Sequence, residues 1–218
     1  MAMGGKMKKT VFFLVAMLLI SAMLFSCGDK DNIPSETSAD NAQSLRRPDI
    51  SQLELSEYIT LGSYSGLVIV CGSDSERGNA VWDKVVADAE VKKYPEEQVN
   101  YYFSQSKAKY EYLAKNGNDS YENIIAALGV TEEQMLEDAR ALVKEDLCFY
   151  AIIKAEGISL SEEEKSKNFD RYVKKYTEAY GYSESYAREN MKEQIYESML
   201  FDKMLEKLII INEFNIEN

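Results

Sequence analysis

The chain has 218 residues, with 37 acidic against 25 basic side chains and a formal net charge of −12. An acidic surface repels phosphate backbones, which disfavours nucleic acid as a partner. The sequence contains no histidine, so it lacks the commonest general base, the Ser-His and Cys-His nucleophile pairs and any imidazole metal ligand. We therefore expect a protein that is not an enzyme and that needs no cofactor or metal.

The N-terminus is typical of a bacterial lipoprotein signal. Lysines at positions 6, 8 and 9 precede an apolar run over residues 11–25, and a small residue, Ser26, stands before Cys27. The run is shorter than the roughly 20 residues of a permanent membrane helix, which favours cleavage before Cys27 over an uncleaved N-terminal anchor. We expect residues 1–26 to be removed and Cys27 to carry acyl chains such as palmitate. Both alternatives place the rest of the chain at the extracytoplasmic face of the cell membrane.

Residues 27–50 form a polar stretch with too few apolar side chains to fold, and we expect a disordered tether. Residues 51–81 follow as an extended segment and linker, because residues 58–70 are rich in β-branched and aromatic side chains and are punctuated by glycine. Of the two later cysteines, Cys71 and Cys148, a disulfide is possible in an oxidising compartment, but buried free thiols are favoured.

From residue 82 to 218 the pattern is helical. A helix begins at Pro95 and ends at Asn116-Gly117, and a short helix from Asp119 or Ser120 ends at Gly129. A capping box at residues 131–134 opens a long helix to Gly157, a second at 161–164 opens a helix to Gly181, and a final helix runs from Ser183 or Ser185 to about Ile211. The fold class is therefore all-α, an open helical array with long arms preceded by one short extended segment.

Two blocks of sequence resemble a known family. The segment Leu-Gly-Ser-Tyr-Ser-Gly-Leu at residues 61–67 resembles the Leu-Gly-x-Tyr-x-Gly-Leu segment that leads into the isomerase domain of bacterial trigger factor. Residues 93–99 resemble the opening of its C-terminal chaperone domain, a peptide-binding helical domain of the kind shared with SurA. Residues 129–134, 151–158 and 161–164 fall in the order seen in that domain, and the helical resemblance covers about residues 82–211.

The departures from trigger factor are as informative as the resemblance. Only residues 71–81 stand where trigger factor has a complete prolyl isomerase domain, and so short a piece cannot form a domain. A lipoprotein signal and tether stand where the ribosome-binding domain would be. The resemblance therefore implies the chaperone part alone, with no ribosome as partner.

We expect a membrane-anchored, ATP-independent chaperone (holdase) for unfolded or nascent exported polypeptides. Tyr and Met suit such a surface, since a phenol ring tolerates water and a thioether adapts to varied clients. Side chains off the core stripe of the helix from Pro95 and on the last helix are the client-binding candidates: Tyr101, Tyr112, Met191, Tyr196 and Phe201. Packing between helices is the alternative for each of them.

Three other functions stay open at this point. A scaffold lipoprotein would use the same helices to bind one dedicated protein partner. A prolyl isomerase-type foldase is disfavoured by the missing β-rich insert and the missing histidines. A solute-binding lipoprotein would need alternating strands and helices, which the pattern does not contain.

Overall fold

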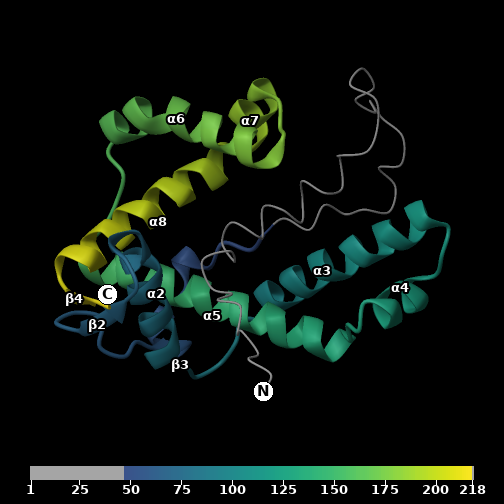
Figure 1. Cartoon of the computed structure of the whole chain (residues 1–218), viewed down its shortest axis with the longest axis horizontal. Coiled ribbons are helices and arrows are strands. Elements are labelled where there is room, and N and C mark those ends of the chain that lie inside the picture. Colours follow the sequence, from purple (N-terminus) through teal and green to yellow (C-terminus); the bar gives the residue numbers. More distant parts are fainter. Residues whose placement is uncertain (1–46, 218) are drawn as a thin grey trace.

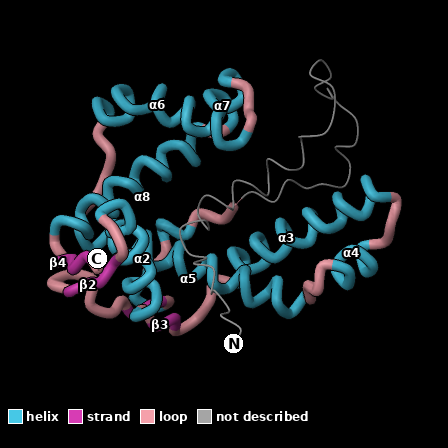
Figure 2. Tube along the Cα trace, in the orientation of Figure 1, coloured by secondary structure: helices cyan, strands magenta, loops and turns pink. Residues whose placement is uncertain are grey.

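The computed structural model describes residues 47–217, so the signal, Cys27 and most of the expected tether lie outside the described residues. Helices dominate the described part, which confirms the all-α prediction (Figure 2). They are α2 (Arg77–Asp88), α3 (Glu96–Gly117), α4 (Tyr121–Ala127), α5 (Glu132–Glu156), α6 (Glu162–Tyr180), α7 (Glu184–Asn190) and α8 (Lys192–Ile210).

Two arms extend from a common body, which agrees with the open helical array predicted from the sequence (Figure 1). We call α3, α4 and the part of α5 packed on α3 the first arm, and α6, α7 and the beginning of α8 the second arm. The remainder of α5 and α8 runs back into the body, where both helices pack on α2. No helix within residues 47–217 combines the length and the apolar character needed to cross a bilayer.

Helix boundaries follow local signals. Ser120, Thr131, Ser161 and Ser183 each accept a hydrogen bond from the backbone N–H three residues later, at 3.1–3.2 Å. The reciprocal bond of a capping box is present at Ser161, whose N–H donates to Glu164 Oε2 at 2.7 Å. Gly157 and Gly181 end their helices in the left-handed conformation, with φ of 61° and 71°.

The expected final helix is two helices rather than one. Met191 leaves helical geometry with φ −111° and ψ 14°, which separates α7 from α8. Ala187 before the break, Met191 at it and Ile195 after it belong to one buried apolar cluster. Residues four positions apart share a face on a continuous helix as well, so the cluster does not explain the break.

Four short strands lie in the body: β1 (Ile59–Thr60), β2 (Val68–Cys71), β3 (Glu90–Val91) and β4 (Glu213–Ile216). β1 pairs antiparallel with β3, and β2 pairs parallel with β4, with Ile69 opposite Phe214. The expected extended segment is thus split into β1 and β2, separated by a turn in which Gly66 has φ 67°. Asn212 fixes this turn, because its Oδ1 accepts from the Leu67 N–H at 2.7 Å and its Nδ2 donates to the Tyr64 carbonyl at 3.0 Å.

Apolar side chains form two separate cores. The body core joins α2, the start of α3 and parts of α5 and α8 with Ile50, Leu55 and Ile59, of which Ile50 lies at the end of the expected tether. The second core lies inside the second arm and consists of Tyr172, Val173, Tyr176, Ala187, Met191, Ile195 and Met199. The second arm therefore has apolar packing of its own, independent of the body.

Candidate functional site

The five client-binding candidates are not brought together in one site. Met191 is 6% exposed inside the second core, and the Phe201 ring packs edge-on against Trp82 with centroids 5.1 Å apart. Tyr196 is half-buried beside Phe169. On α3, Tyr101 packs partly against the body core, whereas Tyr112 is half-buried and belongs to neither core. Client contact stays a prediction for these positions, and Met191 needs a rearrangement of its core to take part.

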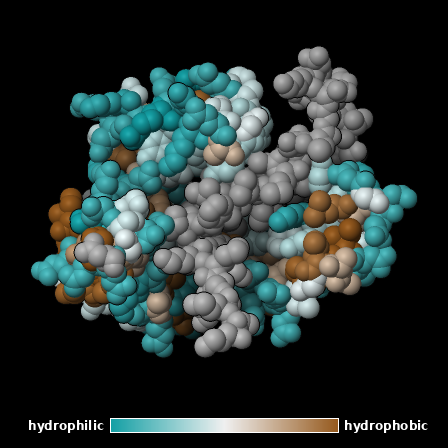
Figure 3. Space-filling view, viewed as in Figure 1, coloured by the Kyte–Doolittle hydropathy of each residue, from teal (hydrophilic) through white to brown (hydrophobic). Residues whose placement is uncertain are grey.

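Sequence reasoning passed over the apolar side chains at the end of the first arm. Leu113 is 40% exposed and Leu128 is 56% exposed, and Ile124 and Ile125 beside them on α4 are half-buried. We call these four residues the tip patch, which is visible as the apolar surface over α3 and α4 in Figure 3. The seven residues of α4 include no buried side chain, and neither core contains a member of the tip patch. The apolar side chains on so short a helix were the available signal.

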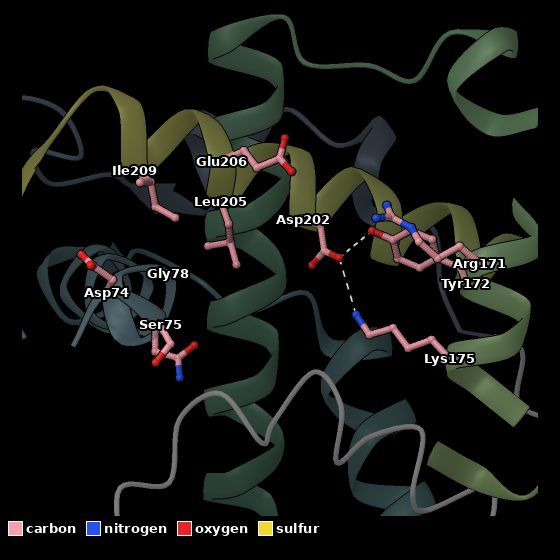
Figure 4. Close-up of a pocket in the computed structure, with 11 residues that line it drawn as sticks. Asp74, Ser75, Gly78, Arg171, Tyr172, Lys175, Asp202, Leu205, Glu206 and Ile209 are labelled. Carbon is pink, nitrogen blue, oxygen red and sulfur yellow. Dashed lines mark hydrogen bonds and ion pairs between the residues drawn. The ribbon is translucent and has the colours of Figure 1, made fainter. Parts of the chain in front are cut away.

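A pocket of about 450 Å³ lies between the start of α2 and the helices α6 and α8 (Figure 4). Its apolar side is formed by Leu205 and Ile209 of α8 and by Gly78 of α2. A Cβ at Gly78 would make ordinary van der Waals contact with Leu205 Cδ1, at 3.7 Å. The other side is charged and carries Arg171, Lys175, Asp202 and Glu206.

The polar side of this pocket is braced by bonds between α6 and α8. Asp202 accepts a hydrogen bond from the Tyr172 hydroxyl at 2.5 Å and pairs with Lys175 Nζ at 3.5 Å (Figure 4). Burial, followed by the bond to Asp202, raises the pKa of Tyr172, so the phenol stays protonated and remains a donor. The site combines an apolar wall with charges of both signs, which suits an extended stretch of polypeptide better than one small charged solute.

A buried polar cluster joins the two arms where they leave the body. Asp146 of α5, 5% exposed, accepts from Gln98 Nε2 at 2.7 Å and from the Tyr102 hydroxyl of α3. The guanidinium of Arg47 donates to Asp146 Oδ1 and to Glu197 Oε2 of α8, both at 2.6 Å. Arg47 thereby bridges α5 and α8. No local signal predicts this bridge, since Arg47 lies 99 and 150 positions away from its two partners.

Fold and surface together define a two-armed helical module with apolar side chains left outside its cores. Residues 73–210 match the family model described as bacterial trigger factor protein (TF) C-terminus, and the chain belongs to this family. This confirms the resemblance read from the sequence.

A related curated protein is the trigger factor of Clostridioides difficile (strain 630), which is 27% identical over 141 residues. The match covers 63% of this chain and 33% of the relative, so the chain spans about a third of the length of that protein. No solved structure matches the chain.

Proposed function

We propose that the protein is a lipid-anchored chaperone that holds unfolded exported polypeptides at the extracytoplasmic face of the membrane without using ATP. Membership of the trigger factor C-terminal family supports a chaperone-like role. The lipoprotein pattern ending at Cys27 supports the anchor and the location.

The observation that carries the proposal is the tip patch. Its side chains stay outside both cores, although burying a Leu or Ile side chain typically contributes about 1.5–3 kcal/mol. Unfolded polypeptides share exposed apolar groups and little else, so a receptor for them needs non-directional apolar contact. The pocket between α2, α6 and α8 adds a second contact region on the other arm. The net charge of −12 helps a protein loaded with an unfolded client to remain in solution.

Light scattering of a chemically unfolded client tests the holding activity. We expect the full chain in lipid nanodiscs to suppress aggregation at equimolar or modest excess. The double variant Leu113→Ser/Leu128→Ser should lose most of this suppression while its stability changes little, because both side chains are partly exposed and belong to neither core. Val68→Ser/Val70→Ser, on the exposed β2 face, is the matched control and should retain it. A wild-type chain without any suppression contradicts the proposal.

The anchor has a separate test. Cells fed a labelled fatty acid should label the wild-type chain and the Cys71→Ala variant, and should leave Cys27→Ala unlabelled. Protease added to intact protoplasts should degrade the wild-type chain if it faces outward. Label on Cys27→Ala, or full protection of the wild-type chain from protease, contradicts the proposed anchor and location. Neither result bears on the holding activity.

A further inference from the structure

The side chain of Arg47 lies in a pocket that other parts of the chain build. Gln98 and Tyr102 come from α3, Asp146 from α5 and Glu197 from α8. The segment that carries Arg47 contributes only the guanidinium. The remaining groups are held in place by long helices, so the pocket does not depend on this segment for its walls.

Each carboxylate in the pocket keeps one oxygen for a cation. Asp146 Oδ2 is occupied by Gln98 and Tyr102, and Glu197 Oε1 accepts from the Tyr150 hydroxyl at 2.6 Å. Asp146 Oδ1 and Glu197 Oε2 are left, and they receive the two terminal nitrogens of the guanidinium at 2.6 Å each. Two acceptors arranged in this way match the planar fork of a guanidinium better than the point charge of an ammonium.

An aromatic ring completes the recognition of the cation. The centre of the Tyr102 ring lies 5.8 Å from Arg47 Cζ, within the range of a cation–π contact. Burial by itself lowers the pKa of Arg47, but Asp146, Tyr102 and Glu197 together raise it, so the guanidinium stays charged. Two carboxylates in so enclosed a place need a cation, because an unpaired buried charge is costly.

The pocket has an open side, and its occupant is loosely tethered. The Arg47 side chain is 26% exposed and that of Glu197 is 19% exposed, so the guanidinium enters from the solvent side. The next firmly buried residue along the chain is Ile50, at 3% exposure, and Asp49 between them is exposed. Arg47 can therefore leave by movement of a few residues, while Ile50 stays in the body core.

We infer that this pocket is a guanidinium-binding site that Arg47 fills from within the chain and that an arginine side chain of a bound polypeptide fills in its place. Its position supports this exchange: Asp146 lies on the helix of the first arm and Glu197 on that of the second, so a chain held between the arms passes the pocket. The identity of the incoming polypeptide rests on the proposed function. The affinity of the pocket for guanidinium does not.

Rescue by a small cation tests the site on the full chain in nanodiscs. Arg47→Ala should melt at a lower temperature than wild type, and methylguanidinium at concentrations that do not affect wild type should restore the lost stability. Methylammonium is the matched control and should restore much less. Asp146→Asn added to Arg47→Ala should abolish the methylguanidinium effect. An Arg47→Ala protein that methylguanidinium does not stabilise overturns the site.

Exchange is tested with an arginine-containing peptide and its citrulline counterpart, which has the same shape without the charge. We expect the arginine peptide to bind Arg47→Ala at least about tenfold more tightly than wild type, as follows if Arg47 fills the pocket for about nine-tenths of the time. The citrulline peptide should bind both proteins equally. If Arg47→Ala does not fold, Arg47→Lys is used in its place. This variant keeps the positive charge but lacks the planar guanidinium that donates to both carboxylates. Equal affinity of variant and wild type for the arginine peptide overturns the exchange.

These outcomes are separate from the holding activity. Methylguanidinium rescue in a protein that fails to suppress aggregation supports the pocket and contradicts the chaperone. Suppression of aggregation without rescue by methylguanidinium supports the chaperone and overturns the guanidinium-binding site.

Discussion

Tyr172 on α6 donates a hydrogen bond of 2.5 Å to Asp202 on α8, and this bond closes the polar side of the pocket between the second arm and the body. A second link lies nearby, where Lys203 Nζ of α8 contacts Glu164 Oε1 of α6 at 2.6 Å. Hydrogen bonds from Lys203 and from Ser161 lower the pKa of Glu164 to about 2, so this carboxylate stays charged. The placement of α6 on α8 thus depends on polar bonds as well as on the second core.

Removing the Tyr172 hydroxyl should loosen the second arm. In Tyr172→Phe, Asp202 keeps only Lys175, and we expect a local loss of about 1 kcal/mol. Hydrogen exchange measured by mass spectrometry should speed up in α6 and α7 and stay unchanged in α3. Tyr186→Phe, at a tyrosine 40% exposed on α7, should leave all three helices as they are. Faster exchange throughout the chain would contradict a local role.

The second core should unfold on its own when it is damaged. Ile195 is 0% exposed there, and Ile195→Ala should cost about 2–5 kcal/mol, which is large for a cluster of so few side chains. We expect protease to cut first within α6 and α7 while the body and first arm persist as a stable product. Ile210→Ala is the control, since Ile210 is 80% exposed. A single cooperative loss of the whole fold would show that the two cores are coupled.

Glu145 should make stability depend on pH. Burial, and then the neighbouring Asp146, raise its pKa from 4.5 to about 7. Between these two values the folded chain holds a proton that the unfolded chain has lost, so the free energy of unfolding falls as pH rises. The loss is complete above about pH 7 and is on the order of 3 kcal/mol.

Glu145→Gln removes this titration. Wild type should lose free energy of unfolding between about pH 4.5 and about pH 8, whereas the variant should not lose this contribution. The difference between variant and wild type should therefore shift in favour of the variant by roughly the amount that wild type loses. Urea unfolding at the two pH values measures the difference, and Glu137→Gln on the exposed face of α5 is the control. The prediction fails if Glu145→Gln and wild type show parallel pH profiles.

Both described cysteines should resist alkylation in the folded chain. Cys71 and Cys148 are buried free thiols, and burial raises the pKa of Cys148 to about 12. Because the thiolate is the nucleophile, Cys148 should react only as fast as the fold opens. Comparison of Cys71→Ala and Cys148→Ala assigns each rate, and unfolding in urea should release both thiols. A disulfide between the two in a non-reducing peptide map would contradict this expectation.

Local chemistry made the helix boundaries predictable. Ser120, Thr131 and Ser161 start helices because a side-chain oxygen satisfies a free backbone N–H, and Gly157 ends one because it adopts positive φ at little cost. All of these signals lie within a few residues of the boundary. The break at Met191 had no such signal, because neither glycine nor proline stands there.

Long-range pairing was beyond the sequence pattern. The sequence pattern assigns residues 82–218 to a helical domain and does not predict the strand β4, because its partner β2 stands about 145 positions earlier and no local pattern links the two. The bridge made by Arg47 was missed for the same reason. The tip patch was missed for a different reason: apolar side chains on a helix normally pack in a core, and only the structure places these four outside both cores.

The parallel pairing of β2 with β4 has a consequence for synthesis. Every helix from α2 to α8 lies between the two strands in the chain, so each is complete before the ladder can form. Contacts between such distant segments form slowly, because a long loop must close first. The β2–β4 pairing is therefore the last part of the body to form. Until residue 216 is available, the backbone groups of β2 lack their β4 partners, although the helices of both arms have already been synthesised.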